Sequence, residues 1–138
     1  MRKKKSPSKY SKVMLIDDNV IDNFINSKMI EGCNFSEHTY THTNGKSALE
    51  FLKNIESVRK VSKTLAPQVI FLDINMPIMD GFWFIDEFDK LGKSIKSGCK
   101  IYLLTASLNP SDVEKSRKNR YVTGYISKPL SEKMLAEL

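Results

Sequence analysis

Residues 67–84, P-Q-V-I-F-L-D-I-N-M-P-I-M-D-G-F-W-F, decide the fold of this chain. The stretch begins with an uninterrupted apolar run from Val69 to Leu72. A run so short and so rich in branched and aromatic residues is typical of a strand buried on both faces of a parallel sheet. The run ends on Asp73, and Pro77 and Gly81 then break the chain before a new apolar segment. Because open α/β sheets bind ligands beyond the carboxyl ends of their strands, the sequence predicts that Asp73 is the reactive residue.

Short apolar or threonine- and aromatic-rich runs outside this stretch predict four more strands, at residues 13–16, 35–43, 101–104 and 122–126. Apolar residues at helical spacing predict helices at 20–32, 45–55 and 82–91. The helix-start cluster at 109–112 predicts a mostly polar helix at 111–120, and Ser131 is a suitable cap for a last helix. The first of these helices carries the stripe Val20, Ile21, Phe24, Ile25 and Met29. Strands that alternate with helices predict an α/β fold in which a parallel sheet carries helices on both faces.

Two connecting segments are less clearly patterned. Residues 56–66 are basic, and the sequence leaves open whether they extend the preceding helix or form a loop. Residues 92–98 are rich in lysine and serine, which indicates a linker.

The net charge of +6 comes from the first twelve residues. Six lysine and arginine residues precede Val13 with no acid among them, whereas the rest of the chain carries equal numbers of basic and acidic residues. We therefore expect residues 1–12 to be a disordered basic tail and residues 13–138 to be one domain. No apolar run approaches the roughly 18–20 residues of a membrane span, and no apolar core follows the basic start as in a secretory signal, so we expect a cytoplasmic protein.

Four of the predicted strands lead into chemically distinctive residues. These are the pair Asp17 and Asp18, then Asp73, Thr105 and Lys128. Since the ends of parallel strands share one edge of the sheet, we expect these side chains to converge. Three carboxylates that lie together resist ionisation, and a hard divalent cation such as Mg²⁺ removes the conflict because it prefers oxygen ligands. With a lysine and a hydroxyl beside it, such a site suits phosphoryl transfer to an aspartate nucleophile.

The motifs at these strand ends resemble those of the receiver domains of two-component response regulators, close to the single-domain kind of bacterial chemotaxis. They are L-I-D-D-N at 15–19, F-L-D-I-N-M-P-I-M-D-G at 71–81, L-L-T-A at 103–106 and Y-I-S-K-P at 125–129. The resemblance extends from residue 13 to residue 138, and it implies a flavodoxin-like, doubly wound sheet with strand order 2-1-3-4-5.

The resemblance also implies roles for the acids. Asp73 would be the phosphoacceptor, supplied by a sensor histidine kinase or a histidine phosphotransfer protein. Asp18 and Asp73 would hold Mg²⁺ together with the backbone carbonyl of Asn75. Asp17 would act through a metal-bound water.

A switch is implied by the same resemblance. The hydroxyl of Thr105 would turn toward the phosphoryl group, with which Lys128 pairs, and the ring of Tyr125 would move inward when Thr105 moves. The Lys128–Pro129 peptide would be cis, as only X-Pro bonds readily are. The altered surface would be the helix at 111–120, the last strand and the start of the last helix. It would face a downstream protein target, and the domain would be a monomer or a weak dimer.

Two other functions share parts of this pattern. A magnesium-dependent phosphohydrolase similar to the haloacid dehalogenase family needs an acid two positions after its nucleophile, and here that position is Asn75, which cannot exchange a proton. We therefore expect only self-phosphorylation and slow loss of the acyl phosphate. A DNA-binding regulator needs an output domain after the receiver, but the sequence ends at Leu138. We expect no sequence-specific binding to nucleic acid, because a basic tail alone gives only salt-sensitive, non-specific contacts.

Overall fold

A computed structural model of the chain describes residues 7–76, 80–106 and 109–138. Within these ranges, five parallel strands form one sheet in the order β2-β1-β3-β4-β5, which confirms the expected flavodoxin-like order. The strands are β1 (Tyr10–Ile16), β2 (Ser36–His42), β3 (Val69–Asp73), β4 (Lys100–Thr105) and β5 (Val122–Ser127). The helices are α1 (Val20–Gly32), α2 (Gly45–Ser57), α3 (Ser62–Leu65), α4 (Gly81–Asp89), α5 (Lys93–Lys96), α6 (Pro110–Arg117) and α7 (Glu132–Glu137). The predicted chain break at Pro77 and the first six residues of the predicted tail lie outside the described residues.

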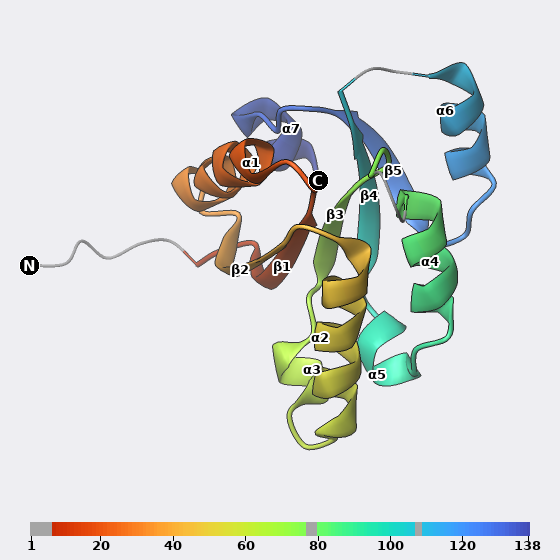
Figure 1. Cartoon of the computed structure of the whole chain (residues 1–138). Helices are drawn as coiled ribbons and strands as arrows, with labels where there is room; N and C mark the ends of the chain where they lie inside the picture. The colour runs from red at the N-terminus through yellow and green to blue at the C-terminus, as the bar shows by residue number, and fades with distance from the viewer. Residues whose placement is uncertain (1–6, 77–79, 107–108) are drawn as a thin grey trace, which may run out of the picture.

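Helices cover both faces of the sheet, with α1 and α7 on one face and α2, α4 and α5 on the other (Figure 1). Side chains alternate along each strand and so supply a core on either side. On β3, Val69 and Phe71 belong to the core beneath α1 and α7, whereas Ile70 and Leu72 belong to the core beneath α2 and α4. All residues of β3 are buried, as its unbroken apolar run predicted. Asp73 therefore stands where the most enclosed strand of the sheet ends.

The sheet takes in more of the N-terminal segment than the sequence indicated. Tyr10 pairs with Ser36 of β2, and its backbone N–H donates to the carbonyl of Phe35 at 3.0 Å. The rings of Tyr10 and Phe35 lie 5.1 Å apart. This pairing corrects the tail boundary, because β1 begins at Tyr10 although residues 10–12 are mostly polar and carry no apolar pattern of their own.

Two short helices occupy the poorly patterned segments. The basic segment 56–66 contains the end of α2 and then α3, and the predicted linker 92–98 contains α5. The Tyr40 hydroxyl of β2 donates to the carbonyl of Leu65 at 2.9 Å, which ties the end of α3 to the sheet. Tertiary contacts, and not helix propensity, account for helices of only one turn, since isolated short helices are marginal in water.

α1 packs on the sheet through Asn23, Asn26 and Ile30, and most of its apolar stripe faces outward. The exposed residues of the stripe are Val20, Ile21, Phe24 and Ile25. Asn23 is buried and donates to the carbonyls of Asp17 (2.9 Å) and His42 (3.1 Å). Asn26 is 1% exposed, and its Oδ1 accepts the backbone N–H of Leu130 at 3.0 Å. The two asparagines thus pair backbone groups of three separate segments, which sets the orientation of the helix.

This inverted burial predicts that Asn26→Ala is more destabilising than Phe24→Ala. Removing the Asn26 amide leaves the buried N–H of Leu130 without its partner, which costs about 1–3 kcal/mol of unfolding free energy. Phe24 is 61% exposed, so its truncation should change the unfolding free energy by only about 0.5 kcal/mol. Urea denaturation of both variants measures the difference, and a larger loss for Phe24→Ala would contradict this orientation of α1.

Candidate functional site

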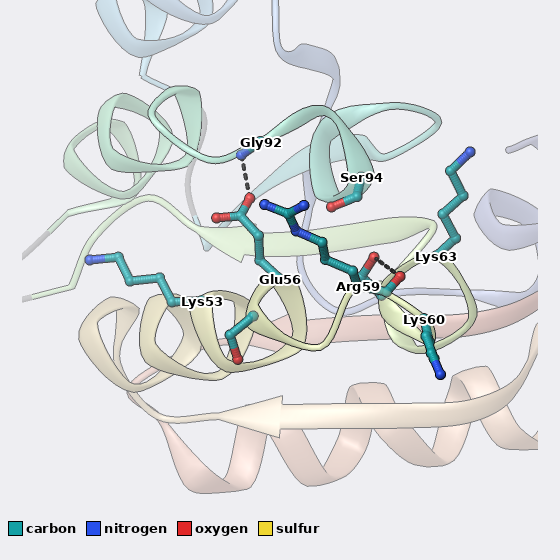
Figure 2. A pocket seen from close by; sticks show the side chains of 9 residues that line it. Lys53, Glu56, Arg59, Lys60, Lys63, Gly92 and Ser94 are labelled. Carbon is teal, nitrogen blue, oxygen red and sulfur yellow. Dashed lines mark hydrogen bonds between the residues drawn. The ribbon is translucent and has the colours of Figure 1, made fainter.

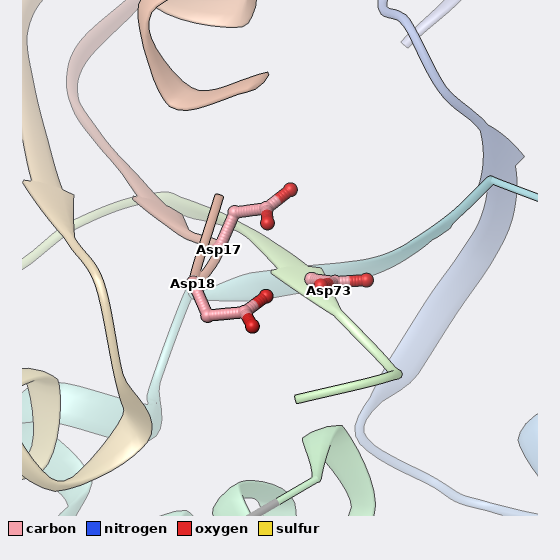
Figure 3. Close-up of side chains that lie close together, drawn as sticks. All are labelled: Asp17, Asp18 and Asp73. Carbon is pink, nitrogen blue, oxygen red and sulfur yellow. The ribbon is translucent and has the colours of Figure 1, made fainter. Parts of the chain in front are cut away.

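Three carboxylates meet at the carboxyl edge of the sheet. β1 and β3 are neighbours and pair Ile16 with Leu72, so the residues that follow, Asp17 and Asp73, emerge side by side. Carboxylate oxygens of Asp17, Asp18 and Asp73 all lie within 4.8 Å of one another (Figure 3). Asp17 and Asp73 are 1% and 4% exposed, whereas Asp18 is open to solvent. The predicted cluster therefore forms, with two buried acids and one at the mouth.

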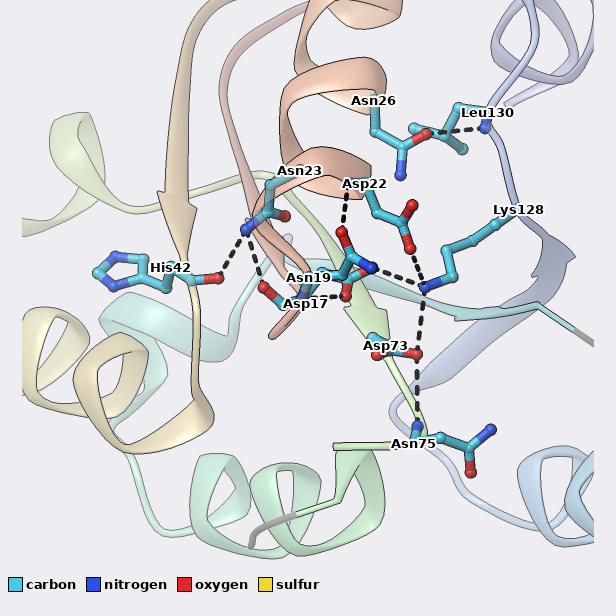
Figure 4. Close-up of polar contacts among 10 residues, drawn as sticks. All are labelled: Asp17, Asn19, Asp22, Asn23, Asn26, His42, Asp73, Asn75, Lys128 and Leu130. Carbon is cyan, nitrogen blue, oxygen red and sulfur yellow. Dashed lines mark hydrogen bonds and ion pairs between the residues drawn. The ribbon is translucent and has the colours of Figure 1, made fainter. Parts of the chain in front are cut away.

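Lys128 lies against this cluster. Its Nζ is 2.8 Å from Asp17 Oδ2 and 3.7 Å from Asp73 Oδ1 (Figure 4). The backbone fixes where the side chain starts, because the Lys128 N–H donates to the carbonyl of Thr105 at 2.7 Å. The peptide that follows, Lys128–Pro129, is cis, as the resemblance implied. The structure thus brings together residues that lie 111 positions apart in the sequence.

Asp22 joins the site although no pattern in the sequence indicated it. It belongs to the first turn of α1, and its Oδ2 lies 2.9 Å from Lys128 Nζ. Acidic residues are common in the first turn of helices because they complement the helix dipole. Nothing local therefore distinguished Asp22 from an ordinary helix-start acid. Its role depends on the position of Lys128, which comes from the opposite end of the chain.

The surroundings of Asp73 disfavour its ionised form. Burial, and after it the negative charge of Asp17, raise the pKa of Asp73 from 3.8 to about 7, although Lys128 and the N–H of Asn75 (3.3 Å) oppose the shift. Burial alone would lower the pKa of Lys128, but its hydrogen bonds to Asp17 and Asp22 outweigh burial and raise that pKa. Lys128 is therefore always positively charged, but its one charge cannot neutralise Asp17, Asp22 and Asp73 together.

The donor set fits a hard divalent cation. Carboxylate oxygens are the ligands that Mg²⁺ prefers, and three of them converge here with an excess of negative charge. Asn75, whose backbone carbonyl the resemblance placed among the ligands, follows two residues after Asp73, and its side chain is exposed. A cation bound here would relieve the repulsion that raises the pKa of Asp73.

The expected switch residues occupy neighbouring strands. Thr105 is fully buried at the end of β4. Tyr125 of β5 is half-buried and pairs opposite Leu103, and its buried hydroxyl has no hydrogen-bond partner among the residues that the structure describes. Side chains two residues apart on a strand share a face, so Thr105 and Leu103 point to the same side, where Tyr125 also packs. The two residues are thus placed on one face of the sheet, at the edge that carries Asp73.

The raised pKa of Asp73 predicts how stability depends on pH without metal. Between pH 3.8 and about 7 the folded protein keeps a proton that the unfolded chain has lost, so the unfolding free energy falls as pH rises through this window. Asp73→Asn removes this loss and should be more stable than the wild type above pH 7, by on the order of 1–3 kcal/mol. The two proteins should converge near pH 4.

Urea denaturation in EDTA across this pH range measures the effect. Glu50→Gln, which neutralises an exposed acid on α2, is the matched control and should follow the wild type. If the unfolding free energies of Asp73→Asn and the wild type changed in parallel with pH, ionisation of Asp73 would not destabilise the folded protein.

Comparison with known proteins agrees with this geometry. A family model described as the response regulator receiver domain matches residues 13–138. A two-component response regulator from Cytophaga hutchinsonii is 32% identical, with a TM-score of 0.82 over 92% of each chain. The chemotaxis protein CheY4 of Vibrio cholerae shares the fold, with a TM-score of 0.69 at 23% identity over 93% of this chain and 94% of that one.

Relatives also occur within longer proteins. The sensor histidine kinase CheAY of Helicobacter pylori is 31% identical over 97% of this chain, and a protein-glutamate methylesterase/protein-glutamine glutaminase of Paramagnetospirillum magneticum is 28% identical over 91% of it. This chain spans only 15% and 29% of the length of those two proteins. None of the helices in the described ranges combines the length and apolar character that crossing a membrane requires.

Proposed function

Because this chain belongs to the response regulator receiver domain family of two-component signalling systems, we propose that Asp73 is the residue that accepts the phosphoryl group. The family implies a histidine kinase or a histidine phosphotransfer protein as the partner. The observation that carries the assignment is the position of Asp73 at the end of β3, between Asp17 and Lys128. Asp18 is more exposed, and both carboxylate oxygens of Asp17 are engaged, Oδ1 by the backbone N–H of Asn19 at 3.0 Å and Oδ2 by Lys128 Nζ at 2.8 Å, so neither is placed as well to attack.

In the proposed reaction a carboxylate oxygen of Asp73 attacks the phosphorus of a phosphohistidine. The phosphorus–nitrogen bond breaks, the imidazole leaves with its electron pair, and an acyl phosphate forms on Asp73. Asp18, Asp73 and the Asn75 carbonyl would hold Mg²⁺, with Asp17 acting through a water. Bound there, the cation supplies positive charge to the phosphoryl oxygens. The Lys128 ammonium, 3.7 Å from Asp73, supplies a second positive charge.

The nucleophile must be ionised to attack, and its raised pKa explains why the site would need a cation. A carboxylate whose pKa is about 7 is half protonated near neutral pH. Positive charge nearby lowers that pKa and restores the anion. We infer that catalysis is limited to self-phosphorylation and slow hydrolysis of the acyl phosphate. Asn75 stands where an aspartate-based phosphohydrolase places its general acid, and an amide cannot serve in that role.

The surface around the pocket suits a protein as phosphodonor. A cavity of about 300 Å³ next to the cluster is lined by Asp22, Ile25, Asn26, Ala106, Lys128 and Pro129. Beside it lies the exposed apolar stripe of α1, and exposed apolar surface of this kind is typical of contacts between proteins.

We place the domain in the cytoplasm, as a monomer or weak dimer. The free thiols of Cys33 and Cys99 are in keeping with that reducing compartment.

Phosphorylation of Asp73 is tested with acetyl phosphate as a small donor. The wild type with Mg²⁺ should gain one phosphoryl group, detected by mass spectrometry of the intact protein and of its peptides. Asp73→Asn and the wild type in EDTA should gain none, because the first lacks the nucleophile and the second the cation. Asp112→Asn, which removes an acid from α6, is the matched control and should be phosphorylated normally. An equal phosphate load on Asp73→Asn would overturn the assignment.

Readout is proposed to run through Thr105 and Tyr125 to the surface formed by α6, β5 and the start of α7. The phosphoryl group lies inside the pocket, so a target protein can sense it only through a change elsewhere. A hydrogen bond from the Thr105 hydroxyl to the phosphoryl group draws that side chain toward Asp73 and vacates space for the ring of Tyr125. Because the Tyr125 hydroxyl has no hydrogen-bond partner among the described residues, movement of the ring would break no hydrogen bond described there.

Thr105→Ala should leave Asp73 phosphorylatable but uncouple it from that surface. One charge-assisted hydrogen bond is worth roughly 1.5–3 kcal/mol, which is enough for about a ten- to hundredfold population shift. Amide exchange over residues 109–130, with and without beryllofluoride as a phosphate mimic, measures the coupling. Thr105→Ser keeps the hydroxyl and should retain the response, as should Thr123→Ala on the exposed side of β5. Equal responses in wild type and Thr105→Ala would mean that the coupling takes another route.

A further inference from the structure

A second pocket lies at the opposite edge of the sheet from Asp73. It is about 740 Å³ in volume, and its lining comes from the end of α2, the turn that follows, α3, and the residues at the start of α5 (Figure 2). α3 and α5 lead into β3 and β4, so the pocket is at the amino ends of these strands. The lining residues are Lys53, Glu56, Ser57, Arg59, Lys60, Ser62, Lys63, Gly92 and Ser94. None of them takes part in the proposed phosphorylation.

The walls of this pocket are held by hydrogen bonds. The carboxylate of Glu56 accepts the backbone N–H of Gly92, which joins α2 to the segment before α5. A Cβ at position 92 would lie 2.6 Å from Glu56 Oε2, so a larger residue there would require the Glu56 side chain to shift. Ser62 is 2% exposed and donates to the carbonyl of Arg59 at 3.3 Å, which stabilises the turn before α3. The basic side chains therefore start from fixed positions.

The charge in the pocket is unbalanced. Four cationic side chains line it, namely those of Lys53, Arg59, Lys60 and Lys63, against the single acid Glu56. In the part of the chain that the structure describes, no ion pair involves any of these four. The Arg59 side chain extends across the pocket toward the contact between Glu56 and Gly92 (Figure 2). Four exposed cations around one hollow, with a single acid among them, raise the local concentration of anions.

We propose that this pocket binds a small anion that carries several phosphate groups, such as a linear oligophosphate or the phosphate chain of a nucleotide. Its volume is in the range of small-molecule sites, about 300–1,000 Å³. Arg and Lys are the side chains that recognise phosphate, and serine hydroxyls can add further hydrogen bonds. The lining holds no aromatic ring, so nothing there would stack on a nucleobase, and recognition rests on the phosphates. The cations belong to α2, the turn after it and α3, and they surround one hollow instead of forming the long stripe that a nucleic acid would follow.

The test is isothermal titration with tripolyphosphate at low and at physiological ionic strength. The wild type should bind one equivalent, with weaker affinity at higher salt. The triple variant Lys53→Ala/Arg59→Ala/Lys63→Ala should lose about tenfold or more in affinity. The matched control, Arg117→Ala/Lys118→Ala/Lys133→Ala, removes the same charges from exposed positions on and after α6 and on α7, and should keep the affinity.

Glu56→Gln should change the affinity for tripolyphosphate in the opposite direction from the triple variant of the pocket. The glutamine oxygen can still accept the Gly92 N–H, while the only negative charge of the pocket is lost, so tripolyphosphate should bind several-fold more tightly. Asp73→Asn should bind as the wild type does, which separates this proposal from the one on phosphorylation. A comparison of the affinities for ATP and for tripolyphosphate distinguishes a nucleotide from a bare phosphate chain. Tighter binding of ATP would require a contact to the nucleoside.

Three results would overturn the proposal. They are no saturable binding of tripolyphosphate to the wild type, equal losses in the two triple variants, and unchanged binding in Glu56→Gln. A single-stranded oligonucleotide that binds more tightly than tripolyphosphate, with contributions from Arg117 and Lys133, would assign the basic residues to nucleic acid instead. Amide shifts confined to residues 53–63 and 92–96 in the titration would support the pocket as the site.

Discussion

The ammonium group of Lys128 against the buried carboxylates of Asp17 and Asp73 is the contact on which this edge of the molecule depends. Two buried anions on adjacent strands would be too costly without a cation near them. The hydrogen bonds from the Lys128 N–H to the Thr105 carbonyl and from the Leu130 N–H to Asn26 hold the end of β5 beside α1, where Lys128 can reach these acids. The same contact leaves the site with an excess of negative charge, since the single positive charge of Lys128 is shared among Asp17, Asp22 and Asp73. A site left in this state favours the binding of a cation and of a phosphoryl group together.

The rest of the sheet holds that contact in place. β3 is buried along its whole length, so its last residue cannot move far without disturbing both cores. Gly81, at the start of α4, lies so close to this strand end that a Cβ there would be 3.1 Å from the Asp73 carbonyl. Hydrogen bonds of Asn23 and Asn26, together with the buried side chain of Ile30, position α1 and leave most of its apolar stripe beside the site and open to solvent.

The two charged sites divide the molecule between the two edges of the sheet. The carboxyl edge gathers acids and one lysine, which suits a metal and a transferred phosphoryl group. The amino edge gathers cations around Arg59 and Lys63, which suits a bound anion. α2 connects the two regions, because it begins beside His42, whose Nδ1 lies 3.0 Å from Ser47 Oγ, and ends at the basic pocket. The two sites thus share one core, while the excess charge is negative at the carboxyl ends of the strands and positive at their amino ends.

The sequence by itself determined the sheet and most of the site, because both depend on local features. Uninterrupted apolar runs such as 69–72 specify strands buried on both faces, and acids at the ends of parallel strands must meet at one edge whatever the loops do. Only the tertiary structure decided the start of β1 at Tyr10, the outward face of α1, and the pairing of Asp22 with Lys128. Each of these depends on a partner far away in the sequence, as Asp22 and Lys128 are 106 positions apart, and no local pattern encodes such a distance. The basic pocket has the same origin, since α3 and α5 are too short to form without the contacts that place them together.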